Sequence, residues 1–337
     1  MEVVRGIRAA GSEFSANTAL AYLSNCKLAS IGRQAAYGLT WKGDRVMGLR
    51  VNRKKDASER VKPGDERTHQ KNLSRPSAEE IYQQVASNAR QELGRTTTSL
   101  CLSGFGGGAF MGLSALGTAI AIALLGPSPA THVISRMFYP IGFIVVLIGR
   151  SQLFTENTLY PVALVLAEKR EFWNTMRLWS VVLPANVVGA FAFSMLAAWT
   201  PALNPAFTET LSQLGANAIA HPASSIFWSG VIGGWIIALA AWLVSGSHSI
   251  TGSVMVIWML TFIVGLGDFA HCIATSCEVF VTILTHHAPW VAYPEWFFPA
   301  VLGNICGGVG LVTILEYGQV IYGQEAEETV AREKKAS

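Results

Sequence analysis

A short polar segment interrupts a long apolar run in the middle of this chain. The segment Arg150–Thr158 reads RSQLFTENT, and it lies between two apolar stretches, Met137–Ile148 and Leu159–Ala167. Each stretch alone is too short to cross the roughly 30 Å hydrocarbon core of a bilayer, but together they are long enough. Polar, non-helical backbone at membrane depth is tolerated only where it is buried in protein or lines a water-filled path. The segment therefore predicts a membrane helix that is broken beside a conduction path.

Charge is distributed along the chain in a way that indicates a membrane protein. Hydrophobic residues make up 51% of the sequence and charged residues 14%, and 17 of the 25 Lys and Arg residues precede residue 99. The rest of the chain holds long stretches almost without charge, which is typical of membrane-spanning helices. The net charge of +3 comes from basic flanks on an apolar body and does not indicate nucleic-acid binding.

We expect an all-α membrane protein with six transmembrane helices. The predicted spans are Leu100–Leu125, Phe138–Ala167, Leu178–Trp199, Ile226–Val244, Val254–Leu284 and Phe297–Val320. The second and fifth spans are too long for one straight crossing and contain polar interruptions, so both helices are predicted to be broken. Lys and Arg gather in the N-terminal region, in the loop between the second and third spans and in the C-terminal tail. This distribution predicts a multi-pass protein with both termini in the cytoplasm.

The regions outside the spans differ in character. The four predicted regions are 1–76, 77–96, 97–322 and 323–337. The first is cytoplasmic and largely disordered, because Arg45–Arg75 is charged and poor in apolar residues. The second is an amphipathic helix that begins at the capping-box pair Ser77 and Glu80. The third is the transmembrane domain, and the fourth is a cytoplasmic tail. Translation can start at Met1 or at Met47, and the sequence leaves both open.

The chain also carries a weak internal repeat. The motif Asn186–Gly189 of the third span is matched by Asn304–Gly307 of the sixth, 118 positions later. The two predicted helix breaks, near Thr155 and His271, lie 116 positions apart. Each half holds three crossings, an odd number, so the halves must be inverted relative to each other. Inverted repeats with paired broken helices are an architecture of transporters, in which the substrate path lies where the two breaks meet.

Three motifs in this order resemble the formate/nitrite transporter family. They are LFTENT, which begins at Leu153, GDxxH, which begins at Gly267, and GNICGG, which begins at Gly303. The similarity covers about residues 77–322, and the fuller strings are most similar to a less characterised inner-membrane branch of the family. The resemblance implies an aquaporin-like fold in the bacterial inner membrane and homopentamers with one pore per protomer. It also implies transport of small monovalent anions such as formate, nitrite or hydrosulfide.

The resemblance further implies which residues line the pore. The expected positions are Tyr139, Phe143, Leu153, Phe154, Thr155, Val264, His271 and Thr275. His271 matches the central pore histidine, Thr155 the threonine that faces it, and Leu153 an apolar constriction residue on the cytoplasmic side. The two aromatic residues of the second helix align with further constriction positions. Val264 aligns with a bulky aromatic residue, so a looser periplasmic constriction is expected, and Thr275 stands where the family usually has Asn.

The chemistry expected of His271 is intelligible from the residue itself. Imidazole titrates near neutral pH and can take part in proton transfer to a weak-acid anion. A neutral acid crosses an apolar constriction far more easily than its anion, because burial of a bare charge is strongly unfavourable. Half-helix N-termini that face a break add a positive potential that attracts anions. A core histidine held by hydrogen bonds is the alternative interpretation of His271.

Four ionisable residues at membrane depth depart from the family pattern. They are Arg150, Glu156, Asp268 and Glu278. The Lys that often precedes the fourth span is absent, and His221 lies nearby. Buried charges are normally paired, and Arg150 can neutralise Glu156 or Asp268. Two interpretations remain open, a structural ion-pair network and an altered filter whose unpaired carboxylates repel formate and nitrite.

No motif predicts an enzyme, a metal site or a bound cofactor. The five cysteines lack metal-ligand spacing, and the glycines of Gly104–Ala109 follow no strand, so close helix packing explains them better than nucleotide binding. Three functions remain open. The first is a pentameric channel or proton-coupled transporter for a small monovalent anion or its conjugate acid. The second is a pore of the same fold for a neutral or cationic small solute. The third is a non-conducting scaffold or sensor in the lipid bilayer.

Overall fold

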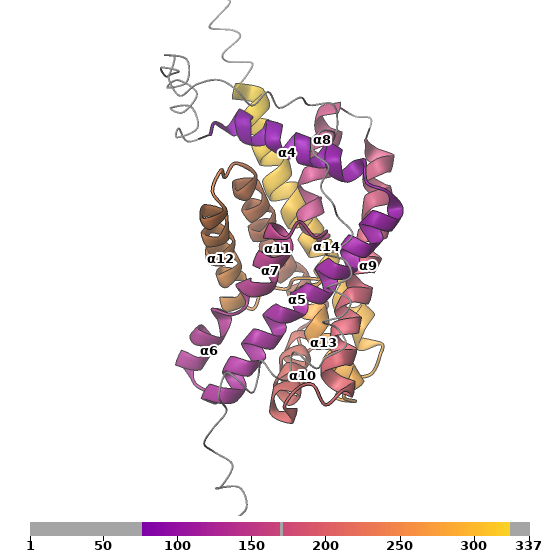
Figure 1. Cartoon of the computed structure of the whole chain (residues 1–337), viewed down its shortest axis with the longest axis vertical. Helices are drawn as coiled ribbons and strands as arrows, with labels where there is room; N and C mark the ends of the chain where they lie inside the picture. The colour runs from indigo at the N-terminus through magenta and orange to yellow at the C-terminus, as the bar shows by residue number, and fades with distance from the viewer. Residues whose placement is uncertain (1–75, 169–170, 324–337) are drawn as a thin grey trace, which may run out of the picture. The chain divides into compact units, whose positions relative to one another are not determined.

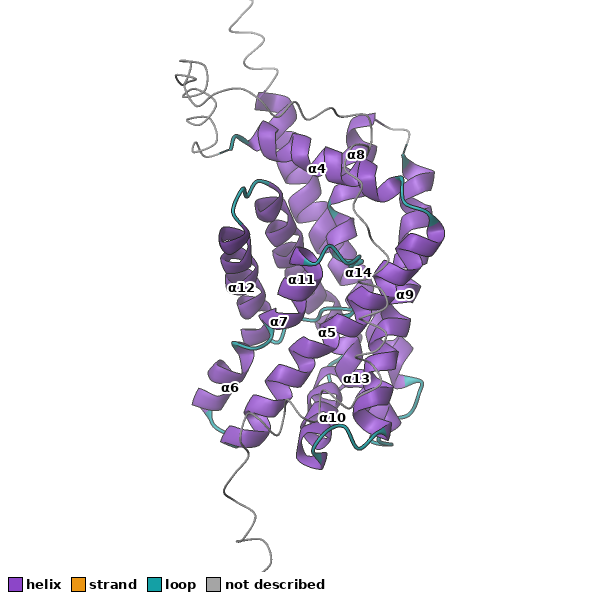
Figure 2. Ribbon diagram, viewed as in Figure 1, coloured by secondary structure: helices purple, strands orange, loops and turns teal. Residues whose placement is uncertain are grey.

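Helices account for every regular element in the part of the chain that the structure describes. The computed structural model describes residues 76–168 and 171–323, which lie in one unit, Gly64–Ser337. Figure 1 shows how the helices are arranged, and Figure 2 shows that loops join them within these ranges. The prediction of an all-α protein is therefore confirmed for these residues. The predictions for residues 1–75 and 324–337 lie outside them.

The helices follow one another with short connections. In chain order the α-helices are α4 (Ala78–Leu93), α5 (Thr97–Leu125), α6 (Pro129–Arg136), α7 (Pro140–Ile148), α8 (Tyr160–Glu168), α9 (Phe172–Trp199), α10 (Pro205–Ile219), α11 (Ala223–Ser245), α12 (Ile250–Leu266), α13 (Ala274–Leu284) and α14 (Ala292–Ile305). A 3-10 turn, η1 (Glu156–Thr158), precedes α8, and a π-helical stretch, η2 (Cys306–Thr313), continues α14.

Five apolar segments of the described chain are long enough to cross a membrane. They are Thr97–Leu125, Pro129–Ile148, Phe172–Trp199, Ala223–Ser245 and Ala292–Gly323. The predicted fifth span corresponds to two shorter apolar helices, α12 and α13. The second segment begins at Pro129, earlier than the predicted start at Phe138. The stretch 129–137, which the predicted span left out, holds one charged residue, Arg136, and in the structure this charge is neutralised by an ion pair with Asp268.

The first described helix, α4, begins at a capping box. The Ser77 backbone N–H donates to the Glu80 carboxylate at 2.9 Å, and the Glu80 N–H donates to Ser77 Oγ at 3.1 Å. Val85 and Ala89 are fully buried on one face, and the helix packs against α8 and α11. The helix α4 therefore lies against the ends of the apolar helices (Figure 1).

Two apolar helices, α7 and α12, end in the same way. A residue with positive φ follows each end, Arg150 with φ 59° and Asp268 with φ 49°. The next amide then donates to the carbonyl five positions earlier, Ser151 to Val146 and Phe269 to Val264, at 3.0 Å in both cases. This hydrogen-bond pattern with a left-handed residue is the Schellman motif, which stops a helix sharply. Both polar interruptions thus leave non-helical backbone in the interior of the described part.

The side chain of Asn186, on α9, satisfies the backbone of the first break. Its Nδ2 donates to the carbonyls of Gly104 and Gln152 at 2.7 and 2.8 Å. Its Oδ1 accepts from the Phe154 amide at 2.8 Å, and Ser103 Oγ accepts from the Gln152 amide at 3.1 Å. Buried backbone groups need such partners, so one asparagine makes the non-helical segment tolerable in an apolar interior.

Asn304, on α14, does the same for the second break. Its Nδ2 donates to the carbonyls of Gly230 and Ala270 at 2.8 and 2.9 Å. Its Oδ1 accepts from the Cys272 amide at 2.9 Å, and Ser229 Oγ accepts from the Ala270 amide at 3.0 Å. Each bond has a counterpart around Asn186, so the two breaks are held by equivalent hydrogen bonds.

Glycine allows the helices that carry these asparagines to approach their neighbours. A Cβ atom at Gly189 of α9 would collide with the Phe105 carbonyl oxygen of α5. A Cβ atom at Gly307 of η2 would collide in the same way with the Val231 carbonyl oxygen of α11. Both glycines are therefore required by close packing of backbone on backbone.

Candidate functional site

The two breaks bring His271 and Thr155 into direct contact. His271 Nε2 lies 2.8 Å from Thr155 Oγ1, and both side chains are fully buried. The residues are 116 positions apart in the sequence, and each is placed by the non-helical segment that follows a Schellman end. The hydrogen bond therefore joins the two breaks at the point where they meet.

The backbone of α13 determines the protonation of the His271 ring. Nδ1 lies 3.0 Å from the Ala274 backbone N–H, which can only donate. Nδ1 is therefore the acceptor, and the proton of the neutral imidazole lies on Nε2. Nε2–H consequently donates to Thr155 Oγ1, while the Thr155 carbonyl accepts from Thr158 Oγ1 at 2.7 Å. A fully charged ring would have to give up the Ala274 hydrogen bond.

Apolar side chains surround the His271–Thr155 pair. Phe143 meets the imidazole edge to face with ring centroids 5.0 Å apart, and Tyr139 lies 5.4 Å from Phe143. Leu153 is fully buried beside the break. Phe154, by contrast, packs against Trp179 of α9 at 5.4 Å, so its ring holds the break in place on α9. Three of these four expected pore positions, Tyr139, Phe143 and Leu153, thus lie around the hydrogen-bonded pair.

A cavity of about 420 Å³ lies next to this apolar layer. Its wall includes five residues expected from the sequence, Tyr139, Val264, Asp268, Thr275 and Glu278. Other parts of the wall come from α10, α11 and α14. Because Tyr139 lines the cavity and also contacts Phe143, an aromatic layer separates the cavity from the imidazole. This cavity, here named the Arg136 cavity, is lined by both polar and apolar side chains and lies beside the aromatic pair of Tyr139 and Phe143.

The charge pairing in the Arg136 cavity differs from the expected one. Asp268 pairs with Arg136, through Oδ1 and Nη2, and not with Arg150, which the sequence left open as one of two alternatives. The physical reason is that α6 brings its last residue, 132 positions away, to the end of α12. Arg136 was outside the predicted spans, so sequence reasoning missed it. The available signal was a lone cation three residues before Tyr139.

The remaining charges divide between the two breaks. Glu278 is buried on the wall of the Arg136 cavity, whereas Glu156 lies half-buried in η1 of the other break. Arg150 is exposed, and within residues 76–168 and 171–323 it forms no ion pair with Glu156. The structure therefore does not bring the four expected charges together in one network.

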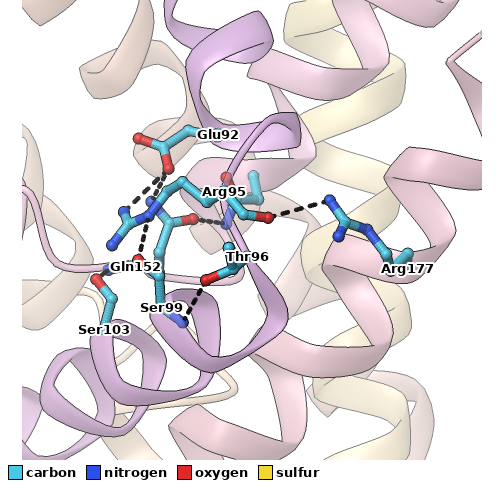
Figure 3. Close-up of polar contacts among 8 residues, drawn as sticks. Glu92, Arg95, Thr96, Ser99, Ser103, Gln152 and Arg177 are labelled. Atoms are coloured by element: carbon cyan, nitrogen blue, oxygen red, sulfur yellow. Dashed lines mark hydrogen bonds and ion pairs between the residues drawn. The ribbon is translucent and has the colours of Figure 1, made fainter.

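A second polar cluster ties α4 to the first break (Figure 3). Glu92 Oε2 accepts from Gln152 Nε2 at 2.7 Å and from Arg95 Nη1 at 3.1 Å. Gln152 Oε1 accepts in turn from Asn157 Nδ2 at 2.9 Å, and Arg177 Nη2 donates to the Leu93 carbonyl at 2.6 Å. Movement of α4 is therefore coupled to the segment that carries Leu153 and Thr155.

Removal of the Glu92 carboxylate is expected to loosen this segment. We expect Glu92→Ala to speed amide hydrogen exchange over Arg150–Thr158 about tenfold, because a charge-assisted hydrogen bond is lost. Hydrogen exchange followed by mass spectrometry in detergent measures this. Gln83→Ala, at an exposed position of the same helix, is the control and should leave exchange there unchanged. Equal exchange in Glu92→Ala and wild type would contradict the coupling.

A comparison of this sequence with known protein families finds a family that matches it. The family described as Formate/nitrite transporter matches residues 79–318. Inner membrane protein YfdC of Escherichia coli (strain K12) is 29% identical over 245 residues, which are 71% of this chain and 78% of that protein. The formate channel BtFdhC of Bacillus thuringiensis is 25% identical over 246 residues, 69% of this chain and 92% of that protein.

Solved structures show the same fold. A chain described as an FNT family ion channel superposes with a TM-score of 0.66 at 19% identity, over 71% of this chain and 98% of that one. A pentameric formate channel with formate bound superposes with a TM-score of 0.58 at 21% identity, over 67% of this chain and 97% of that one. The arrangement of α4 to α14 is therefore one that membrane channels adopt.

Proposed function

Because the chain belongs to the formate/nitrite transporter family, we propose that it forms a membrane pore for a small monovalent anion or its conjugate acid. The observation that carries the proposal is the buried hydrogen bond between His271 and Thr155, where two helix breaks meet. Relatives named formate channel and nitrite transporter support formate and nitrite as the first solutes to consider. Transport, rather than an enzymatic reaction, is the proposed activity.

The proposed architecture is an inverted repeat of three and three crossings with the second and fifth helices broken. The equivalent hydrogen bonds around Asn186 and Asn304, 118 positions apart, support the repeat. The second crossing combines α6, α7 and α8, and the fifth combines α12 and α13. Both termini are proposed to be cytoplasmic, with residues 77–96 as the amphipathic helix and 97–322 as the channel domain.

The assembly is proposed to be a homopentamer in a bacterial inner membrane. The pentameric formate channel of the same fold and the relative named inner membrane protein support this. Large apolar side chains on the outer surface of the helices, such as Leu102, Leu124 and Met255, then face lipid or neighbouring protomers. The lipid bilayer and the transported solute are the partners that this proposal requires.

The chain's residues favour passage of the solute as a weak acid. Tyr139, Phe143, Leu153 and Val264 form an apolar constriction, in which a bare anion is strongly disfavoured. The anion takes a proton from solvent on the cavity side and enters the constriction neutral. Thr155 and the Nε2–H of His271 then replace water as its hydrogen-bond partners. The proton leaves for solvent on the other side, so charge is never carried alone through the apolar layer.

Flux through purified protein in liposomes tests the proposal. Formate, nitrite, hydrosulfide, acetate, ammonium and glycerol form the panel. We expect saturable uptake of formate or nitrite that rises several-fold when the external pH falls by one unit, because the acid fraction rises. A pore for a neutral or cationic solute is the second candidate, since Asp268 and Glu278 line the cavity. Flux of ammonium or glycerol without any anion flux would replace the first candidate by the second.

A further inference from the structure

The Arg136 cavity contains an arginine whose hydrogen-bonding capacity is mostly unused. The Arg136 side chain is only 8% exposed, and its one ion pair joins Nη2 to Asp268 Oδ1. Its Nε is buried and makes no hydrogen bond among the described residues. For Nη1 no hydrogen bond to a described residue is seen either, but of the guanidinium nitrogens only Nε is fully buried without a partner. A guanidinium carries five N–H donors, so a single bond leaves most of them without an acceptor.

Most N–H donors of Arg136 in this cavity lack hydrogen-bond acceptors among the described residues. Unsatisfied buried donors are unfavourable, and a carboxylate or nitrite offers two oxygens that suit the planar guanidinium. The cavity volume of about 420 Å³ accommodates such an anion together with water. Neutral hydrogen-bonding side chains, among them Ser225, Ser229 and Thr275, share the wall.

The two carboxylates of the cavity differ in their relation to Arg136. Asp268 is 58% exposed, so its carboxylate reaches solvent and can separate from Arg136 at small desolvation cost. Glu278 is buried on the same wall and makes no ion pair in residues 76–168 and 171–323. Of the three charged residues, Arg136 is therefore held in place, whereas the carboxylate of its partner Asp268 can move away from it.

We infer that Arg136 is the anion-binding residue of an entry site in this cavity, where a monovalent oxyanion displaces Asp268 before it reaches His271. The inference rests on the proposed transport of an anion. Asp268 neutralises the guanidinium when the site is empty, and it competes with the solute for the same donors. The pair thereby gives the pore a preference for anions although two carboxylates line the cavity.

Formate uptake by variants of the full chain in liposomes tests the entry site. Arg136→Gln is expected to raise the KM for formate about tenfold or more, because a charge-assisted contact is lost. Asp268→Asn is expected to lower KM several-fold, because the competitor is removed while the cation remains. The double variant Arg136→Gln with Asp268→Asn removes both partners of the ion pair together, so neither is left without the other; it should fold and still show the raised KM.

Matched controls separate the entry site from a general change in surface charge. Arg90→Gln and Glu209→Gln remove the same charges at exposed positions outside the cavity and should leave KM unchanged. If wild type takes up the anion and the folded double variant has the same KM as wild type, the entry site is overturned but the proposed function is not. Absence of any anion uptake by wild type would instead overturn the proposed function. The entry site would also be overturned if Arg136→Gln left both the uptake of ammonium and the KM for formate unchanged.

Discussion

His271→Asn is expected to reduce formate flux about 100-fold while the protein remains folded. The asparagine side chain is too short to contact both the Ala274 amide and Thr155 Oγ1, so the Nε2–H donor that is proposed to hold the solute is lost. Loss of a buried hydrogen bond to a polar solute costs about 1–3 kcal/mol, and loss of the Thr155 contact adds to it. Initial rates of formate uptake into liposomes measure the effect.

Two Thr155 variants make this expectation specific. Thr155→Ser keeps a hydroxyl within reach of the imidazole and should retain most of the flux. Thr155→Val keeps the volume but lacks the hydroxyl, so flux should fall about tenfold. Equal flux in wild type and in folded His271→Asn protein would contradict a role of the imidazole in transport. It would then favour the interpretation of His271 as a core residue.

The largest expected effect on stability is at Asn304. Asn304→Leu leaves the Gly230 and Ala270 carbonyls and the Cys272 amide without the partner that they have in the wild type. Each buried group without a partner costs about 1–3 kcal/mol, and three together approach the ~5–15 kcal/mol that stabilises a typical protein. We expect a melting temperature lower by about 10 °C or more, or no folded protein at all.

Thermal unfolding in detergent, followed by intrinsic fluorescence, measures the Asn304 variant. Asn186→Leu should have a similar effect, because Asn186 makes the equivalent three bonds at the other break. Asn174→Ala, at an exposed position of α9, is the control and should change stability little. Wild-type stability in Asn304→Leu would contradict the role assigned to the asparagines.

The elements that could be predicted from the sequence have strong local signals. A polar interruption in an apolar run marks each break, and Asn186 and Asn304 recur at one spacing. The contact between Thr155 and His271 was expected because breaks meet in inverted repeats and because the motifs resemble a known family. These features depend on residues close together in the chain or on a repeated pattern.

The charge pairing could not be predicted, because it depends on how distant segments meet. Arg136 belongs to the short helix α6, and its partner Asp268 is 132 positions away. Nothing near Asp268 in the sequence favours Arg136 over Arg150, which stands closer in the chain. Only the path of α6 and α7 decides between the two cations. The start of the second apolar segment was misplaced for the same reason.

The equivalent hydrogen bonds at the breaks separate the scaffold of this protein from the side chains that are proposed to select the solute. At the spacing of 118, the position equivalent to His271 is Leu153, so one backbone frame presents an imidazole on one side and an aliphatic group on the other. The asparagines bond only to backbone groups, so the hydrogen bonds that they make do not depend on the side chains at positions 153 and 271. On the proposed function, mutations at positions 153 and 271 are expected to alter the solute while the asparagine bonds that hold the breaks remain. A proposed pore of this kind is expected to be evolvable, because changes at these two positions leave the backbone hydrogen bonds of both asparagines intact.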